Sequence, residues 1–187
     1  MIEVISEAIV LDKEDLGEYD SRVFLYTKDF GKVAARATSL RKITSKMSSH
    51  LEPLGYVMAR LVSSRDNLDG PMQLADALSV DYPKKELEIA GIRQALRVAD
   101  CLSHSIPAGV PDKDLWDFLY AIAVGGEPAT LLKALKFLGF DPQFSSCELC
   151  ARTAPEYFSP KNNFFICRTC TLSSAAVRSD FIPVGAV

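Results

Sequence analysis

The chain has 187 residues, of which 48% are hydrophobic and 24% are charged, and its formal net charge is −3. These proportions are typical of a globular protein, and no apolar run approaches the roughly 18 residues of a membrane-spanning helix. Because the net charge is negative, any binding of nucleic acid requires a local basic patch. The first residues lack the basic start and long apolar run of a signal peptide, so we expect a cytoplasmic protein with no membrane partner.

Residues 1–82 are rich in β-branched and aromatic residues that alternate with polar ones, which predicts strands. The expected strands are Glu3–Leu11, Arg22–Lys28, Lys32–Thr38, Tyr56–Ser63 and Gln73–Tyr82. Five strands with one longer insertion after the third favour a small Greek-key barrel of the OB-fold type. A piece of a β-sandwich is the structural alternative.

After residue 82 the hydrophobic period changes from two residues to 3.6, which predicts helices. The apolar stripes are Ile92, Ala95, Leu96, Ala99 and Leu102, then Leu115, Phe118, Leu119, Ile122 and Ala123, then Leu131, Leu132, Leu135 and Leu138. We interpret these stripes as core rather than as membrane or partner faces. The chain is therefore predicted to be an α+β protein, with a barrel domain at 1–82 and a helical domain at 83–187.

Four cysteines form two C-x-x-C pairs that are separated by 16 residues. They are Cys147, Cys150, Cys167 and Cys170. This spacing is typical of a zinc site with four thiolate ligands. The runs at 156–159 and 164–167 predict a hairpin between the pairs, within a zinc finger at 145–172. Four protein ligands leave no open coordination position, so such a site is structural.

The same four cysteines could instead form two disulfides, bind an iron–sulfur cluster or remain free thiols. Disulfides need an oxidising compartment, which the N-terminus does not suggest. Iron–sulfur clusters mostly use tighter cysteine spacings than this one. The fifth cysteine, Cys101, lies in a helical stretch, and we interpret it as a small buried apolar residue.

A basic stretch runs from residue 28 to residue 46, where Asp29 is the only acid. Its basic residues are Lys28, Lys32, Arg36, Arg41, Lys42 and Lys46. Residues an even number apart share one face of a strand, so Lys32 and Arg36 are expected to lie together. A basic face on a small barrel favours binding of single-stranded nucleic acid. The alternative is a solvated face whose acidic partners come from elsewhere in the chain, and charge alone leaves both open.

Two separated parts of the chain carry motifs that occur together in one family. They are Glu7–Leu11, Gly17–Thr27, Phe30–Ala37, Thr44–Lys46 and Leu51–Pro53, with the four cysteines. Together they resemble the bacterial recombination mediator family RecO over almost the whole chain. The resemblance implies an N-terminal OB-fold followed by a helical domain that carries a zinc finger. The chain departs from the family at Ala37-Thr38-Ser39, where a glycine is usual, and family members usually continue through further helix after the finger.

The resemblance implies a protein that binds single- and double-stranded DNA, anneals complementary strands and helps load RecA onto strands coated by single-strand-binding protein, together with the partner RecR. The DNA-binding residues predicted from the basic stretch are Lys32, Arg36, Arg41, Lys42 and Lys46. The acidic, apolar tail of single-strand-binding protein needs an apolar groove rimmed by cations. The predicted residues for that tail are Arg93, Arg97, Lys133 and Lys136.

Two other classes of function remain as rivals. A zinc-ribbon adaptor in transcription or translation, which binds protein or RNA, has the same cysteine pattern. A zinc-dependent hydrolase is disfavoured, because all four predicted ligands are cysteine and the chain has only two histidines. No phosphate loop, G-x-G-x-x-G, H-E-x-x-H or G-x-S-x-G motif is present, so we expect a non-enzymatic protein.

Overall fold

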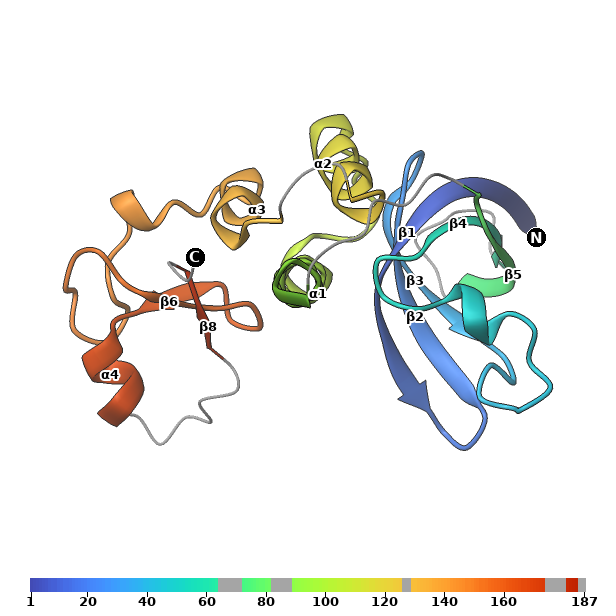
Figure 1. The fold of residues 1–187 in the computed structure, drawn as a ribbon, viewed down its shortest axis with the longest axis horizontal. Coiled ribbons are helices and arrows are strands. Elements are labelled where there is room, and N and C mark those ends of the chain that lie inside the picture. The colour runs from blue at the N-terminus through green and yellow to red at the C-terminus, as the bar shows by residue number, and fades with distance from the viewer. Residues whose placement is uncertain (64–71, 82–88, 126–128, 174–180, 185–187) are drawn as a thin grey trace. The chain divides into compact units, whose positions relative to one another are not determined.

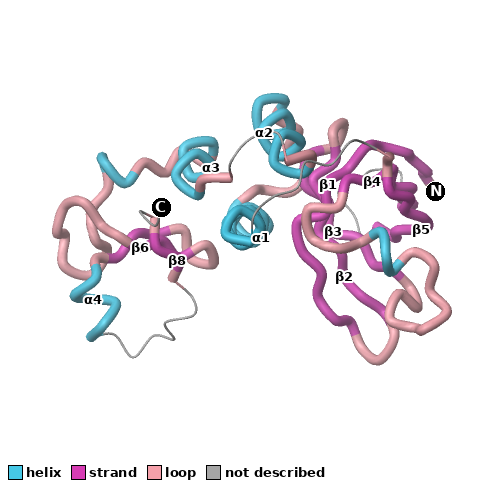
Figure 2. The backbone as a smooth tube through the Cα atoms, viewed as in Figure 1, coloured by secondary structure: helices cyan, strands magenta, loops and turns pink. Residues whose placement is uncertain are grey.

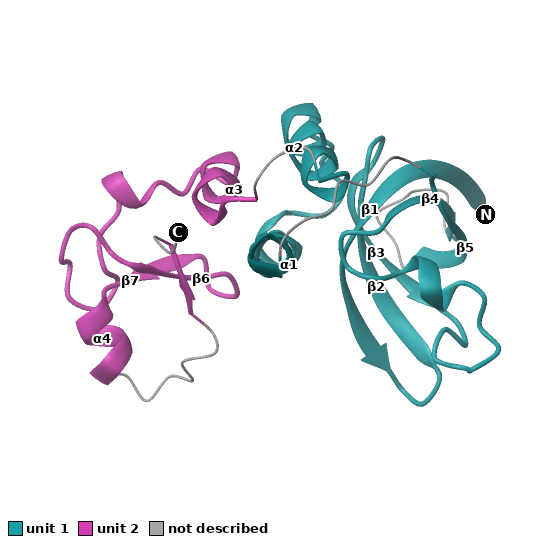
Figure 3. Cartoon of the chain, viewed as in Figure 1, with its two compact units in different colours: residues 1–128 teal, residues 129–187 magenta. Residues whose placement is uncertain are grey.

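The structure is a computed structural model, and it describes residues 1–63, 72–81, 89–125, 129–173 and 181–184 (Figure 1). The chain divides into two compact units, residues 1–128 and residues 129–187 (Figure 3). Among the described residues, the first unit contains five strands, two α-helices and a 3-10 helix, and the second contains the cysteine-rich part. The predicted domain boundary after residue 82 lies outside the described residues and stays a prediction.

Five strands form the OB-like barrel that the sequence predicts at the N-terminus (Figure 2). They are β1 (Ile2–Leu16), β2 (Asp20–Thr27), β3 (Gly31–Ala37), β4 (Tyr56–Ser63) and β5 (Met72–Ser79). Their order around the barrel is β1-β2-β3-β5-β4, and the seam between β3 and β5 consists of two parallel residue pairs. The remaining neighbours pair antiparallel.

The strand β1 is longer than expected because it pairs with two strands, first with β4 and then with β2. Its first half pairs with β4 as far as Ile9, and its second half pairs with β2 as far as Leu16 opposite Asp20. The register with β2 shifts between Val10 and Asp12, just after the pairing with β4 ends. Gly17, at φ +71°, turns the chain into β2.

Side chains on the inner face of the strands fill the barrel. Along β3 the burial alternates strictly, so Val33, Ala35 and Ala37 point inward, whereas Ala34 and Arg36 are exposed. Leu25 and Leu61 are also fully buried in this core. The alternation confirms that Lys32 and Arg36 share the outer face of β3.

Two helices complete the first unit: α1 (Ile89–Ser105) and α2 (Lys113–Ala123), and both contact β1. The predicted stripe of α2 is largely correct, since Leu115, Phe118, Leu119 and Ile122 are buried and Ala123 is half-buried. The stripe of α1 is partly wrong, because Ile92 and Leu96 are 44% and 40% exposed. The buried face of α1 instead includes Val98 and Cys101, which places Ile92 and Leu96 at its margin.

The segment between α1 and α2 is fastened to the barrel at the start of β3. Gly109 N donates to Lys32 O at 3.0 Å, and Asp112 N donates to the hydroxyl of Tyr26 at 2.9 Å. The approach at Gly31 is so close that an added Cβ would lie 2.3 Å from the carbonyl oxygen of Val110. A glycine is required there, both for this contact and for its φ of +65°.

The second unit carries the remaining elements. They are α3 (Leu131–Phe137), the 3-10 helix η2 (Pro142–Phe144), β6 (Tyr157–Ser159), β7 (Phe164–Ile166), α4 (Arg168–Ser173) and β8 (Ile182–Pro183), and a further 3-10 helix, η1 (Ser48–His50), lies in the first unit. The expected hairpin is present, because β6 and β7 pair antiparallel with Phe158 opposite Phe165. The rings of these two residues lie 5.0 Å apart.

Candidate metal centre and nucleic-acid interface

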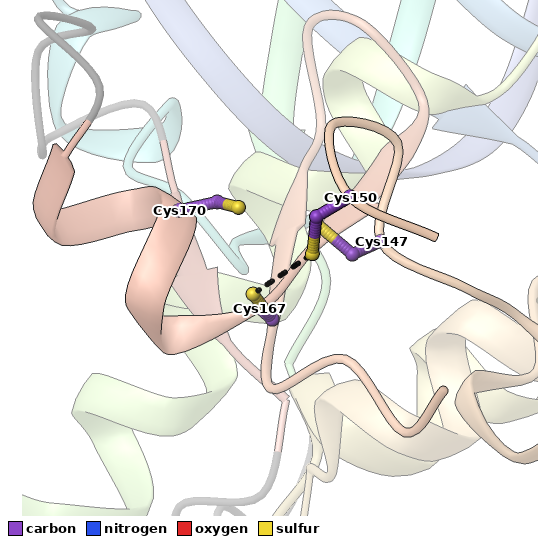
Figure 4. Close-up of side chains that lie close together, drawn as sticks. All are labelled: Cys147, Cys150, Cys167 and Cys170. Atoms are coloured by element: carbon purple, nitrogen blue, oxygen red, sulfur yellow. Dashed lines mark hydrogen bonds between the residues drawn. The ribbon is translucent and has the colours of Figure 1, made fainter. Parts of the chain in front are cut away.

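The four cysteines of the two C-x-x-C pairs converge in the second unit (Figure 4). Cys147 and Cys150 lie on a turn, Cys167 directly follows β7, and Cys170 lies in α4. The first turn is closed by Ala151, whose N–H donates to Cys147 O at 2.8 Å and whose φ is +56°. The same turn is joined to β7, because Glu148 N donates to Phe165 O at 2.9 Å.

The sulfur positions fit a tetrahedral metal site. All four Sγ atoms lie within 4.8 Å of one another, and those of Cys150 and Cys167 are 3.7 Å apart. A Zn–S bond of about 2.3 Å sets the S–S edge of a regular tetrahedron at about 3.8 Å. A disulfide requires about 2.05 Å, and all four cysteines are free. The cluster is therefore one that could hold a metal ion and contains no disulfide.

The surroundings of the thiols favour ionised sulfur at the buried end of the cluster. Burial raises the pKa of Cys147, but backbone N–H donors, led by that of Cys167, outweigh burial and lower this pKa to about 6. The N–H of Cys170 lowers the pKa of Cys167. The pKa of Cys170 is raised to about 12, chiefly by its hydrogen bond with Cys150. A divalent cation would deprotonate such a set outright.

The fifth cysteine has no part in this cluster. Cys101 is fully buried in α1, and burial raises its pKa to about 12. It behaves as the small apolar residue that the sequence analysis expected, and its thiol is inert.

The basic residues of the first unit lie on the outer face of β3 and on the loop that follows it. Arg36 is exposed and donates from Nε to Asp20 Oδ2 at 2.9 Å. Arg41 lies 3.2 Å from Asp15 and donates to Gly17 O at 3.2 Å. Both guanidinium groups thus have acidic partners on the β1–β2 hairpin, as the solvated-face interpretation supposed.

Two lysines in the loop have different surroundings. Among the residues that the structure describes, no carboxylate lies within 4 Å of Lys42 or Lys46. Lys42 Nζ lies 5.3 Å from the centre of the Tyr19 ring, a cation–π geometry. These two ammonium groups are therefore the cations of the stretch that are open to an external anion.

Lys32 is engaged inside the first unit. Its Nζ donates to Ile106 O at 3.0 Å, directly after the last residue of α1, where a cation complements the helix dipole. Burial lowers the pKa of Lys32. Lys28 pairs with Glu7 instead of joining the other basic residues.

Two further side chains lie near the basic residues of β3 and of the loop after it. Arg22 is exposed directly opposite Arg36, and Tyr19 is 45% exposed. Arg22 could have been found from the sequence, because it lies two residues before Phe24 on a strand and residues two apart share one face. In the structure this is the outer face. Two aromatic residues of the same strand region are not available to bases, because Tyr26 is fully buried and Phe30 packs on the barrel core.

The four cations predicted to bind an acidic tail lie on two helices in different units. Arg93 and Arg97 are exposed one turn apart on α1. Lys133 and Lys136 are exposed on α3, and Lys136 lies 3.7 Å from Asp141. Their role stays a prediction.

Of the helices described here, none has both the length and the apolar character needed to cross a membrane.

Two family models match the chain in separate places. The model "Recombination protein O N terminal" matches residues 1–75, and "Recombination protein O C terminal" matches residues 128–179. The first match covers β1 to β4 and the first half of β5, and the second covers α3 and all four cysteines.

Curated relatives agree with these matches. A DNA repair protein RecO of Nocardioides sp. is 30% identical over 192 residues, which cover 91% of this chain and 75% of that protein. The proteins of the same name from Thermodesulfovibrio yellowstonii and Dehalococcoides mccartyi are 29% and 27% identical, with 96% and 88% of this chain and 74% and 69% of theirs covered. The chain therefore belongs to the RecO family of DNA repair proteins.

Proposed function

We propose that this protein is a recombinational repair mediator that binds single- and double-stranded DNA, anneals complementary strands and assists the loading of RecA onto strands coated by single-strand-binding protein. It acts by binding and not by catalysis. The observation that carries the proposal is the group of exposed cations at Arg36, Arg41, Lys42 and Lys46 on one end of a small barrel. Such work belongs in the cytoplasm, at the nucleoid.

The proposed mechanism is electrostatic. Lys42 and Lys46 offer ammonium groups without a carboxylate partner among the described residues, so they take the first phosphates of a strand. Arg36 and Arg41 are held in place by Asp20 and Asp15, and each can turn from its carboxylate to a phosphate at little cost, since exposed ion pairs contribute about 0–1 kcal/mol. Neutralising two strands side by side lowers their repulsion and lets them pair.

Lys32 is the weakest member of the proposed DNA-binding set. Its ammonium already donates to Ile106 O at 3.0 Å, so a phosphate must compete with a helix end. We assign it mainly to holding α1 against β3, with a smaller contribution to DNA affinity.

The metal is proposed to be one structural zinc ion held by the four thiolates of Cys147, Cys150, Cys167 and Cys170. When bound, zinc supplies no chemistry beyond neutralising these thiolates and joining the first C-x-x-C turn to β7 and α4. Binding of the ion is expected to be coupled to folding of residues 145–172.

The proposed protein partners are RecR, RecA and single-strand-binding protein. The tail of the last is acidic and apolar, so we propose that it contacts cations among Arg93, Arg97, Lys133 and Lys136. Titration of a labelled tail peptide against wild type and Lys133→Glu tests this assignment, and equal affinities would remove Lys133 from it.

The experiment that tests the function is an annealing assay. Two complementary oligonucleotides, one carrying a donor dye and one an acceptor, are mixed with and without single-strand-binding protein. The proposal expects annealing to accelerate in both conditions. No acceleration in either condition would contradict it.

A further inference from the structure

The loop after β3 presents a large apolar side chain to solvent at its tip. Ile43 is 105% exposed, between Lys42 and Thr44. The apolar residues on either side of it behave differently, since Leu40 is 1% exposed and Met47 packs against the barrel core. The loop is therefore anchored at both ends, and only its central apolar side chain is left outside.

The backbone of the loop is ordered by hydrogen bonds of its own. Arg41 N donates to Tyr19 O at 2.9 Å, which ties the loop to the turn between β1 and β2. Ser45 N donates to Lys42 O at 2.9 Å, which closes a turn with Ile43 at its second position. The exposure of Ile43 thus follows from a built turn.

A second apolar group is exposed in the same region. The ring of Tyr19 is 45% exposed and lies under Lys42 Nζ at 5.3 Å. A single exposed isoleucine needs no explanation by itself. An isoleucine that follows a lysine whose ammonium lies over a tyrosine ring, with no carboxylate within 4 Å among the described residues, does however match the chemistry of a single strand, which offers phosphates and unpaired base faces together.

We infer that Ile43 and Tyr19 contact the base faces of a bound single strand while the neighbouring cations hold its phosphates. This inference rests on the proposed DNA-binding function and assigns the apolar part of the same site. Bases in a duplex are covered by their neighbours, so these two side chains favour a single strand over a duplex. The contact should not depend on base sequence, because every base has an apolar face.

The test compares two substitutions of the same kind at two exposed isoleucines. Ile43→Ser removes the exposed apolar side chain of the loop after β3. Ile5→Ser is the matched control, because Ile5 is 62% exposed and lies on β1 opposite Arg60 on β4, and not on that loop. The probe is a single-stranded oligonucleotide with one 2-aminopurine, whose emission rises when its neighbours unstack. Fluorescence anisotropy of an end label measures affinity for the same strand and for its duplex.

The inference expects Ile43→Ser to bind the single strand about three- to tenfold more weakly, as loss of partial burial of one isoleucine implies. Its duplex affinity and salt dependence should equal those of wild type, and the rise in 2-aminopurine emission should be smaller. Ile5→Ser should match wild type throughout.

Two results would overturn the inference in distinguishable ways. If wild type binds but Ile43→Ser binds with the same affinity and the same emission change, the apolar contact is absent and the electrostatic function stands. If wild type itself does not bind either DNA, the inference and the proposed function fail together.

Discussion

Arg36 on β3 and Asp20 at the start of β2 lie side by side, with Arg36 Nε donating to Asp20 Oδ2 at 2.9 Å. Asp20 also accepts from Ser39 N at 2.7 Å, so one carboxylate fixes both the arginine and the beginning of the basic loop. The pKa of Asp20 is lowered, first by the Ser39 N–H and then by Arg36. The ion pair therefore persists at neutral pH, and its stabilisation is lost only as the pH falls through this lowered pKa.

Neutralising Asp20 should release Arg36 for DNA. Asp20→Asn keeps the shape of the side chain and removes its charge. We expect tighter binding to a single strand, because Arg36 no longer gives up an ion pair worth about 0–1 kcal/mol, and a slope of log K against log salt equal to that of wild type, because the number of phosphate contacts is unchanged. Salt titration by fluorescence anisotropy measures both quantities.

The matched control for this variant is Asp117→Asn. Asp117 also pairs with a cation, since its carboxylate lies 2.9 Å from Lys113 Nζ, but both residues are on α2. The control variant therefore changes the net charge by the same amount without releasing Arg36. An equal gain in affinity in the two variants would mean that net charge, and not Arg36, governs binding.

The contact between Lys32 and α1 predicts a change in stability. Lys32→Met keeps the aliphatic stem and removes the donor to Ile106 O. We expect the free energy of unfolding of the first unit to fall by about 1–2 kcal/mol, because a charge-assisted hydrogen bond to a helix end is lost. Urea unfolding measures this loss, and DNA affinity should change less than in Arg41→Met. The reverse order would make Lys32 chiefly a DNA contact.

The close approach at Gly31 predicts a larger loss. Gly31→Ala places a Cβ 2.3 Å from Val110 O at a φ of +65°, so the backbone must shift. We expect a loss of about 2–4 kcal/mol in urea unfolding, which combines left-handed strain with a backbone clash. In the control Gly17→Ala, φ is +71° but nothing lies within 4 Å, so only about 1 kcal/mol of strain is expected. Equal losses in the two variants would show that Val110 does not pack on Gly31.

Removal of one thiolate tests the metal centre. Cys147→Ser should lose the metal and unfold residues 145–172, whereas the barrel should keep its far-UV circular dichroism and its unfolding midpoint. Elemental analysis should find one zinc per wild-type chain and none in the variant. Iron in the wild-type protein, or no metal with four titratable thiols, would contradict this assignment.

Elements whose apolar residues recur at a strict period could be predicted from the sequence, because the burial of one face determines both the type of element and which residues point inward. The alternation along β3 and the stripe of α2 are of this kind. The buried face of α1 differs in part from the predicted one, since Val98 and Cys101 are buried whereas Ile92 and Leu96 are exposed. Two stripes of similar hydrophobicity compete on that helix, and packing against the barrel selects between them.

The cysteine cluster was predictable because its chemistry fixes the spacing of its ligands. The partners of the basic residues were not, since Asp15 and Asp20 lie on either side of the turn between β1 and β2 and Ile106 follows the end of α1. Ion pairs across strands depend on the register of the strands, which the sequence does not fix. The contact of Lys32 shows a similar limit of prediction from sequence. Its place on the outer face of β3 followed from alternation, but its contact with α1 required the tertiary structure.

The proposed function requires the cations after β3 to bind DNA and to bring complementary strands together. Its most direct test is the rate of annealing by the triple variant Arg41→Glu, Lys42→Glu and Lys46→Glu, all three of which are exposed. Wild type should show a salt slope of roughly −3 to −4 on a single strand, from about four to six phosphate contacts. The variant should keep its fold and its zinc but no longer bind DNA or accelerate annealing. A folded, zinc-containing variant that anneals strands at the wild-type rate would show that these cations are not the DNA-binding site.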